Sequence, residues 1–381
     1  MSDADPKHRR VSRELHQSIL NGRYPVGARL PSEAQLVRQH GVSRPTVIRA
    51  LKDLEVAGLV ERRMGSGSFV RRPEKTPAVT GRQLGLLIPG LGNTEIFERI
   101  CGELAGVALA QNFSLLWGGS QHPRHDAVLS IDQARQICDQ FIERGVTGVF
   151  FAPFERIPRR EEANREIAER FRLAGMPVIL IDRDLGPFAK RSDFDLVGLD
   201  NMAAGFLLAE HFLKLGCSRI AFVARPDSAS TVDARIAGAQ AAIASRHLEL
   251  ARRWVHLGDP TDTRFVRSLM AGRHWDALLC ANDHTAAELL QTLHREGHRV
   301  PQDIRIAGFD DVRYATFLAQ PLTTIHQPCR EIAIVAMRAM LERLADPSLP
   351  PRSQLLAPAL VIRETCGTYS EPSRTKKREP K

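Results

Sequence analysis

The sequence predicts an α/β fold class in which an N-terminal winged helix-turn-helix precedes a two-lobed domain with parallel, doubly wound sheets. Residues 31–70 show two helix patterns followed by a hairpin with a glycine tip, and from residue 84 short apolar runs alternate with longer amphipathic segments. A third observation is that excess positive charge is confined to the two ends of the chain. Together these observations separate a small basic domain from the larger domain that follows it.

Two short helices are indicated near the N-terminus. Ser32 and Gln35 have the spacing of a capping box, and Gly41 stands where a helix ends in the left-handed conformation. Ser43 can cap a second helix, which Gly58 would end. The apolar residues that recur on one face of this second helix are Val47, Ala50, Leu51 and Leu54.

A hairpin and an upstream helix complete the small domain. Residues 59–63 alternate apolar and charged side chains, Gly-Ser-Gly at 65–67 makes a tight turn, and residues 68–70 return. Apolar residues at helical spacing predict a further helix over 11–19. This is the outline of a winged helix-turn-helix, in which one helix enters the DNA major groove.

The same stretch resembles the DNA-binding domain of the GntR family. The matching motifs are L-P-S-E at 30–33, G-V-S-R-x-T-V at 41–47, A-L-x-x-L-E at 50–55, G-L-V at 58–60 and G-S-G-S-F-V at 65–70. The family usually has Arg where this chain has Ile48, so either Arg49 takes over that contact or Ile48 packs on a thymine methyl group. The resemblance implies operator DNA as a partner, contacted by Ser32, Glu33, Arg44, Pro45, Thr46, Arg49, Gly65, Ser66 and Gly67.

Charge supports a polyanionic partner for the N-terminal domain alone. Residues 1–80 hold fifteen Lys or Arg against eight Asp or Glu, and residues 371–381 hold five against two. The whole chain has a net charge of +9, so residues 81–370 have a net charge of −1. The tail over 369–381 is expected to be disordered, and it either attracts phosphates or only solubilises the chain.

The cysteines and the polar N-terminus indicate the compartment. The six cysteines contain no C-x-x-C pair, which suits free thiols in a reducing compartment. The start of the chain has no apolar signal-peptide region, and no run approaches the roughly 18 apolar residues of a membrane span. A soluble cytoplasmic protein without a membrane partner is therefore expected.

After a proline-containing linker, the chain alternates apolar runs that suit buried strands with segments that suit helices. This alternation indicates parallel sheets buried on both faces, and nearly 290 residues favour two lobes with a cleft. The expected strands are 84–88, 113–117, 146–151, 177–182, 195–199, 219–223, 276–281 and 304–309. The expected helices are 95–111, 131–144, 161–175, 201–215, 233–247, 284–297 and 329–345.

Ligands of such sheets gather at the carboxyl ends of the strands. There this chain places Asp, Asn and Arg side chains, which suit a polyhydroxyl ligand. Strand-end Asp is also a common helix N-cap, and Asp283 and Asp311 are assigned mainly to that role. The candidate effector-binding residues are Asn93, Glu95, Phe97, Arg183, Arg225, Arg235, Asn282, Asp310 and Gln327.

The larger domain resembles the effector domain of LacI/GalR repressors, which shares its fold with periplasmic sugar-binding proteins. The resemblance implies that Asn282 and Asp310 hydrogen-bond an effector, that Arg183 closes over it and that Arg235 lines the cleft. Cys329 stands where several relatives place an aromatic ring that stacks on the ligand. The matching segments are P-V-I-L-I-D-R at 177–183, D-N-x-x-x-G at 200–205, H-F-L-K-L-G-C-S-R-I-A-F at 211–222, A-N-D at 281–283, G-F-D-D-V at 308–312, P-L-T-T-I-H-Q-P at 321–328 and V-I-R-E-T at 361–365.

These patterns give a division of the chain. The order of a GntR-type reader and a LacI-type domain is similar to that of the arabinose repressor class. The predicted limits are 7–72 for the winged helix-turn-helix, 73–82 for the linker, 83–368 for the effector domain and 369–381 for the tail. Lobe 1 is expected over 83–199 and 326–355, and lobe 2 over 200–325 and 356–366.

The leading interpretation is a repressor, active as a homodimer, whose operator binding is controlled by a small polar effector, most directly a sugar. A nucleoside or another metabolite in place of the sugar is one alternative. Another is a fusion enzyme of the pyridoxal-phosphate aminotransferase class, which would need a Schiff-base lysine, and only Lys190 and Lys214 lie between Thr76 and Thr375. A transport binding protein is disfavoured by the DNA reader. No catalytic residue, metal or cofactor is predicted.

Overall fold

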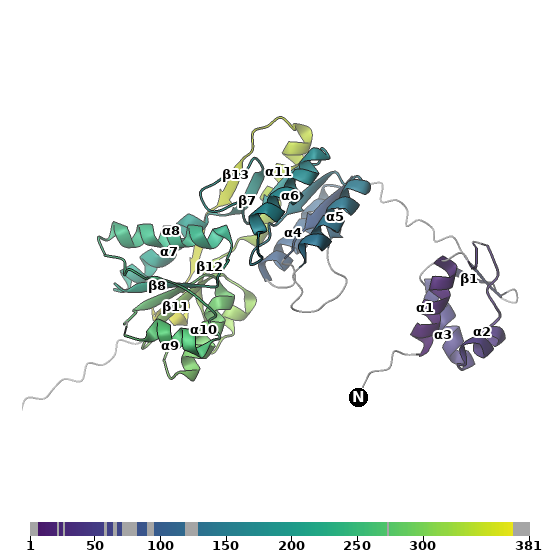
Figure 1. The fold of residues 1–381 in the computed structure, drawn as a ribbon, viewed down its shortest axis with the longest axis horizontal. Coiled ribbons are helices and arrows are strands. Elements are labelled where there is room, and N and C mark those ends of the chain that lie inside the picture. The colour runs from purple at the N-terminus through teal and green to yellow at the C-terminus, as the bar shows by residue number, and fades with distance from the viewer. Residues whose placement is uncertain are drawn as a thin grey trace, which may run out of the picture. The chain divides into compact units, whose positions relative to one another are not determined.

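The computed structural model describes residues 7–20, 23–25, 27–56, 59–63, 67–70, 82–89, 95–118, 129–272 and 274–368. They belong to two compact units, which divide between Thr80 and Gly81 (Figure 1). Four parts of the sequence predictions lie outside the described residues: the wing tip with Gly65 and Ser66, Asn93, nearly all of the linker, and the tail.

The first unit is a winged helix-turn-helix, as predicted. Its apolar core joins all three helices and the hairpin, and includes Val11, Leu36, Val47, Leu51 and Val70. The hairpin strands pair antiparallel, Val60 opposite Val70. The elements are α1 (Lys7–Leu20), α2 (Glu33–His40), α3 (Arg44–Val56), β1 (Val60–Arg63) and β2 (Gly67–Val70).

The predicted capping box at the start of α2 is confirmed. The backbone N–H of Gln35 donates to Ser32 Oγ at 3.3 Å, and the backbone N–H of Ser32 donates to Gln35 Oε1 at 2.8 Å. Gly41 ends the helix with φ 63°, a conformation that costs a glycine little. The capping box and Gly41 therefore set the first and last residues of α2, and so the position of the turn before α3.

The second unit contains two six-stranded sheets, each in its own lobe. Lobe 1 has the strand order β13-β7-β6-β5-β3-β4, all parallel. Helices α4 and α11 pack on one face of this sheet, and α5 and α6 on the other. The elements are β3 (Arg82–Leu87), α4 (Glu95–Ala110), β4 (Phe113–Gly118), α5 (Ile131–Glu143), β5 (Gly148–Phe151), α6 (Arg160–Leu173), β6 (Val178–Ile181), β7 (Asp195–Leu199), α11 (Cys329–Ala345) and β13 (Ser353–Leu356).

Lobe 2 has the strand order β14-β12-β11-β10-β8-β9, and only the edge strand β14 runs antiparallel to its neighbour. Figure 1 shows α7 and α8 on one side of this sheet and α9 and α10 on the other. The elements are α7 (Asn201–Lys214), β8 (Ile220–Ala224), α8 (Ser230–Ser245), β9 (Val255–Leu257), α9 (Thr263–Met270), β10 (Ala277–Cys280), α10 (Asp283–Arg295), β11 (Arg305–Asp310), the 3₁₀ helix η1 (Arg313–Thr316), β12 (Thr323–His326), β14 (Ala359–Val361) and the 3₁₀ helix η2 (Glu364–Cys366).

The predicted fold class is therefore confirmed, with additions. All eight predicted strands and all seven predicted helices of this unit are present, with ends shifted by up to three residues. The sequence patterns did not predict α9 or the strands β9, β12, β13 and β14. The chain crosses between lobes after β7, after β12 and between β13 and β14.

A close helix pair positions part of the site in lobe 2. A Cβ at Gly205 would overlap the carbonyl oxygen of Arg235, and a Cβ at Gly238 would overlap that of Met202. The absence of these side chains lets α7 and α8 touch through their backbones. This contact brings Asn201, at the start of α7, against Arg235 on α8.

Candidate functional site

Charged side chains from both lobes meet at the carboxyl ends of the strands. We call Glu155, Asp182, Arg183, Arg235, Asp310 and Gln327 the interlobe cluster. The first three belong to lobe 1, Arg235 and Asp310 belong to lobe 2, and Gln327 lies at the crossing after β12. Apart from the half-buried Glu155, every member is buried.

In lobe 1 the cluster is organised by Arg183. Its Nη1 lies 3.1 Å from Glu155 Oε2, and its Nε donates to Asp182 Oδ2 at 3.0 Å. The guanidinium carbon lies 5.3 Å from the centre of the Phe97 ring. The Arg183 guanidinium is therefore held by two carboxylates and by the Phe97 ring.

In lobe 2 the cluster is organised by Arg235. Its Nε donates to Asn201 Oδ1 at 2.7 Å and its Nη1 to the Ala281 carbonyl at 2.6 Å. Its Nη2 lies 3.5 Å from Asp310 Oδ1, and its guanidinium carbon lies 4.6 Å from the centre of the Phe309 ring. The arginine is held from several sides, which fixes the direction of its remaining N–H groups.

Within the described part of the chain, two acceptors of the cluster have no hydrogen-bond donor. Asp310 Oδ1 and Gln327 Oε1 are both buried and accept no hydrogen bond from the described residues. Asp310 Oδ1 has only the longer ion pair with Arg235, at 3.5 Å, and Gln327 Nε2 donates to Asp182 Oδ1 at 3.3 Å. Buried polar atoms are almost always paired in folded proteins. Acceptors of this kind fit the hydroxyl groups of a ligand, which can donate to both.

The backbone is strained at the same place. Asp182, Asp310 and Asp311 have φ values of 72°, 114° and 53°, in the region that side-chain-bearing residues avoid. Such strain is retained where the surrounding structure holds it, and it gathers at functional sites. The carboxylates of Asp182 and Asp310 are aimed by this strained backbone.

The electrostatics favour an uncharged ligand. Burial raises the pKa of Asp310 to about 7, against the opposing attraction of Arg235. Burial also pushes the pKa of Glu155 upward, but Arg183, Arg156 and the backbone N–H of Ala229 together hold that pKa below its usual value. With three carboxyl groups and two guanidinium groups, the cluster offers no surplus positive charge to an anionic ligand.

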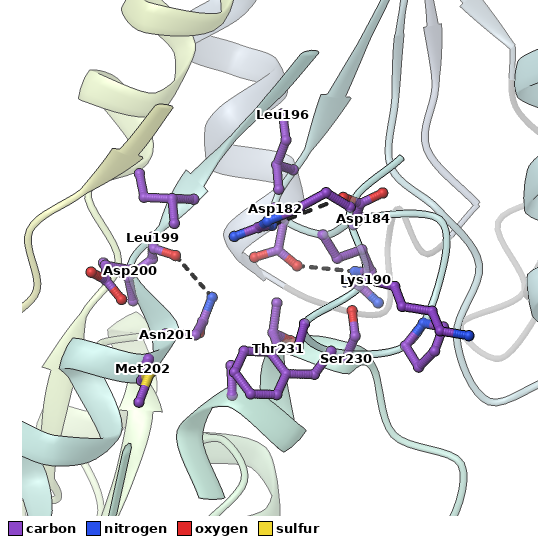
Figure 2. A pocket seen from close by; sticks show the side chains of 17 residues that line it. Asp182, Asp184, Lys190, Leu196, Leu199, Asp200, Asn201, Met202, Ser230 and Thr231 are labelled. Carbon is purple, nitrogen blue, oxygen red and sulfur yellow. Dashed lines mark hydrogen bonds and ion pairs between the residues drawn. The ribbon is translucent and has the colours of Figure 1, made fainter. Parts of the chain in front are cut away.

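A cavity of about 240 Å³ adjoins the cluster, and Figure 2 shows the residues around it. It is formed by the segment after β6, the start of α7 and the first turn of α8. Asp182 and Arg183 line it together with Asn201 and Thr231. The apolar part of its lining comes from Phe188, Leu196, Leu199, Met202, Ala234 and Leu355.

The structure brings five of the nine predicted effector residues together, namely Phe97, Arg183, Arg235, Asp310 and Gln327, and Asn93 lies outside the described residues. The other three have different contacts. Arg225 Nη2 pairs with Glu288 at 2.8 Å and Asp259 at 3.1 Å, Asn282 caps α10 by accepting from Thr285, and Glu95 accepts from the backbone of Arg313.

The assignment of Asp283 and Asp311 to helix capping was wrong. Asn282 caps α10, whereas the buried Asp283 accepts hydrogen bonds from Thr324 Oγ1 at 2.6 Å and Val312 N at 3.1 Å. Asp311 lies 2.7 Å from His326 Nδ1 and also accepts from Arg363. Both carboxylates therefore bind residues distant in sequence and do not cap the helix that follows them.

One cluster member, Glu155, was missed by the sequence analysis. It stands four residues beyond the end of β5, so its strand-end position was the signal that could have found it. Cys329, at the position of a ligand-stacking ring in several relatives, is buried, and burial raises the pKa of its thiol to about 12.

In the first unit, Glu33 joins two arginines at the start of α2. Arg44 Nε donates to Glu33 Oε2 at 3.0 Å, and Arg62 Nη2 donates to Glu33 Oε1 at 2.7 Å. Arg62, from strand β1, was not among the predicted DNA-binding residues. The Arg44 side chain is 74% exposed, so its guanidinium is open to a phosphate or base edge.

The other predicted DNA-binding residues lie near this group. Pro45 and Arg49 are exposed on α3, and Thr46 Oγ1 lies 2.8 Å from Ser43 Oγ. Gly67 has φ 108°, and a Cβ there would lie 2.8 Å from Arg29 Nε. Arg29, Arg44 and Arg62 line one hollow with Glu33, Glu55 and Gly67, so three arginines gather beside two glutamates between α2, α3 and the wing.

Within the described residues no group of His, Cys, Asp and Glu side chains has the arrangement of a metal site. No helix in that part of the chain is long and apolar enough to span a membrane. The six cysteines are free and buried.

Comparisons with known proteins give a separate match in each of the two units. Residues 7–70 match the model of the bacterial regulatory proteins of the gntR family, and residues 209–366 match a periplasmic binding protein-like domain. The arabinose metabolism transcriptional repressor of Geobacillus stearothermophilus is 24% identical over 372 residues, which cover 94% of this chain and 97% of that protein. The regulator MalR of Streptomyces coelicolor is 25% identical over 340 residues, covering 87% of this chain and 95% of that protein.

Solved structures show the same fold. A LacI family transcriptional regulator from Enterococcus faecium with bound ribose is 21% identical and has a TM-score of 0.60, covering 74% of this chain and 98% of that one. The chain thus joins an N-terminal DNA-binding domain of the GntR family to a periplasmic-binding-protein-like effector domain of the LacI type.

Proposed function

We propose that this protein is a transcription regulator, a repressor that binds operator DNA through its first unit and a small uncharged sugar between the lobes of its second unit. The observation that carries the proposal is the interlobe cluster. It combines two fixed guanidinium groups with Asp310 Oδ1 and Gln327 Oε1, which accept no hydrogen bond from the described residues. Hydroxyl groups both donate and accept, so a sugar satisfies this set.

Operator binding rests on the helix-turn-helix. Arg44, Thr46 and Arg49 lie on α3, which would enter the major groove, and Arg62 and Gly67 lie on the wing strands. Ser32, Glu33 and Pro45 position the start of this surface. A homodimer would place two such readers on the half-sites of a palindrome.

The effector class is supported by the relatives and by the charge of the cluster. A relative covering nearly all of the chain is named for arabinose metabolism, and a structural neighbour holds ribose. The matched curated relatives are transcription regulators, which favours this function over a pyridoxal-phosphate enzyme. Ligand binding would control operator binding to the extent that the ligand prefers one arrangement of the lobes.

DNA binding is tested by selecting bound sequences from a random DNA pool with the full-length protein. We expect an enriched palindrome, and we expect Arg44→Ala to lose affinity for it at least tenfold while binding the effector normally. The exposed Arg264, 91% exposed on α9, provides the matched control as Arg264→Ala. Equal operator affinity in Arg44→Ala would refute the assignment of the recognition helix.

Effector binding is tested by thermal shift against pentoses, hexoses, disaccharides, sugar phosphates and nucleosides, because a ligand that binds only the folded state raises the melting temperature. We expect an uncharged sugar to stabilise the protein and to change operator affinity. Asp310→Ala and Arg183→Ala should retain operator binding and ignore the sugar. Normal responses in both variants would exclude this cluster as the effector site.

A further inference from the structure

We propose that the 240 Å³ cavity beside the interlobe cluster receives a ring attached to the sugar, so that the effector is a glycoside or nucleoside rather than a free monosaccharide. This inference rests on the proposed function, because it assigns the second part of the same effector.

The cavity and the cluster share part of their wall. Asp182 and Arg183 belong to the cluster and also line the cavity. Asn201 lines the cavity and accepts a hydrogen bond from Arg235 of the cluster. A ligand whose hydroxyl groups occupy the cluster can therefore extend into the cavity without leaving the shared wall.

The apolar part of the lining suits a flat ring that is mostly apolar. Phe188, Met202 and Leu355 come from three separate segments and are 38%, 47% and 40% exposed, although such side chains are usually buried. Exposed apolar groups that converge on one hollow are typical of a ligand surface. The Thr231 side chain also lines the cavity and is 9% exposed.

The test compares matched ligand pairs by calorimetry on the full-length protein. The pairs are D-ribose with adenosine, D-glucose with phenyl β-D-glucoside, D-galactose with phenyl β-D-galactoside and L-arabinose with its phenyl glycoside. For the sugar that the protein accepts, we expect the ring-bearing partner to bind about tenfold tighter or more. Phe188→Ala should reduce this gain while leaving free-sugar affinity unchanged, and Leu173→Ala, a control at an exposed position of α6, should not.

The pairs also distinguish the two sources of the ring. Tighter binding confined to adenosine identifies a nucleoside, and tighter binding confined to a phenyl glycoside identifies an aryl glycoside. Equal binding within every pair would overturn the cavity assignment and leave the proposed function standing. No binding by any ligand would overturn the sugar assignment and this inference with it.

A second, independent inference comes from backbone contacts between the lobes. We infer that Glu95 and Glu155 of lobe 1 are positioning residues that hold the lobes closed by accepting from backbone N–H groups of lobe 2. Both oxygens of Glu95 accept from Arg313 N, at 2.9 and 3.1 Å, across 218 positions of sequence. The carboxylate of Glu95 therefore binds the backbone of the opposite lobe.

Glu155 makes the corresponding contact at the start of α8. Its carboxylate lies near the backbone N–H of Ala229, the N-cap residue of that helix, and this N–H helps to lower the pKa of Glu155. In a capping box this N–H is satisfied by a Glu or Gln three residues later, but Ala229 supplies no capping side chain of its own. A glutamate of lobe 1 therefore lies beside the N-terminus of a helix in lobe 2 that has no side-chain cap.

The carbonyl of Asp227 supports the same contact region. It accepts from Arg156 N at 3.1 Å and from the Arg160 side chain, both in lobe 1. When the lobes separate, all of these groups exchange their partners for water. Because a hydrogen bond to a charged group is stronger than a neutral one, each glutamate contact should shift the closed-to-open ratio about tenfold.

The test is amide hydrogen exchange on the full-length protein without added ligand. In Glu95→Ala we expect faster exchange at Arg313, which loses its partner, and also at Ala229, which Glu95 does not touch. Small-angle scattering of Glu95→Ala should show a larger radius of gyration. Glu95→Gln should recover part of the protection from amide exchange, because its amide oxygen can still accept a hydrogen bond. Glu98→Ala, exposed on the same helix, is the control.

The remote amide distinguishes a closure device from a local contact. Faster exchange at Arg313 with unchanged exchange at Ala229 would overturn the inference. An unchanged radius of gyration would also overturn it. Because no effector is present, this result does not depend on whether the sugar assignment is correct.

Discussion

Arginine–carboxylate pairs organise both units of this protein, at opposite extremes of burial. In the winged-helix unit, the Arg44 side chain is 74% exposed beside Glu33. In the second unit, the Arg235 side chain is 5% exposed and that of Asp310 is 11% exposed. An exposed pair contributes little to stability and leaves its arginine available to a phosphate, whereas a buried pair cannot lose one member without exposing the other to an apolar interior.

The largest difference should appear when one arginine is truncated. Arg235→Ala removes hydrogen bonds to Asn201 and Ala281 and leaves Asp310 without its cation. We expect the free energy of unfolding of the second unit to fall by about 3–5 kcal/mol. All three tryptophans, Trp117, Trp254 and Trp275, lie in this unit, so their fluorescence during urea unfolding reports it.

The control for that measurement is Arg264→Ala, whose exposed side chain pairs with Asp262 at 3.5 Å and should contribute less than about 1 kcal/mol. A similar small loss in both variants would contradict the contrast drawn between buried and exposed pairs.

The buried pair should also make stability depend on pH. The pKa of Asp310 in the folded protein, about 7, lies above its ordinary value of 3.8, so the folded state binds a proton that the unfolded state has released between these values. Its contribution is fully present below about pH 4 and is lost as pH rises through about 7. We expect the free energy of unfolding of Asp310→Asn, measured relative to that of the unmodified protein, to rise by a few kcal/mol between pH 5 and pH 8. A difference that does not change with pH would mean that Asp310 titrates as an ordinary surface carboxyl group.

The sequence predicted most of this architecture because its buried strands are nearly continuous apolar runs, which parallel sheets require. The strands that it missed carry a different signal. Strands β9, β13 and β14 lie at sheet edges and are partly exposed, so they lack such runs. Strand β12 is buried but begins Thr323-Thr324, whose hydroxyl groups are paired with distant residues such as Asp283.

The sequence could predict which residues lie at the candidate site, but not which hydrogen bonds and ion pairs they form there. The strand-end rule located Arg183 and Asp310, because chain topology places those positions together. It could not predict that Glu95 pairs with a backbone N–H of the other lobe, since this requires the closed arrangement of both lobes. Arg225 was predicted by the same rule, but Glu288 and Asp259 lie close enough to take its guanidinium.

A smaller effect is expected from helix capping, which can be compared directly between the units. Ser32 and Ser130 form the same capping box, at the starts of α2 and α5. Each Ser→Ala substitution should cost about 1 kcal/mol, and only in its own unit. Amide hydrogen exchange resolves the two: Ser32→Ala should speed exchange in α2 and leave α5 unchanged, with the reverse for Ser130→Ala. Loss of protection in both helices from one substitution would show that the units unfold together.

The smallest change in stability should accompany a large change in function. Arg44→Ala removes one exposed ion pair, and Glu33 keeps its hydrogen bond from Arg62, so the free energy of unfolding should change by about 0–1 kcal/mol. Operator affinity should fall at least tenfold in the same variant, because its guanidinium is held toward solvent rather than into the core. Hydrogen exchange of α3 measures the first quantity and fluorescence anisotropy of labelled operator the second. If Arg44→Ala instead lowered the free energy of unfolding as much as Arg235→Ala, Arg44 would have a structural role like that of Arg235. The difference in burial between the two arginines would then not explain a difference in their roles.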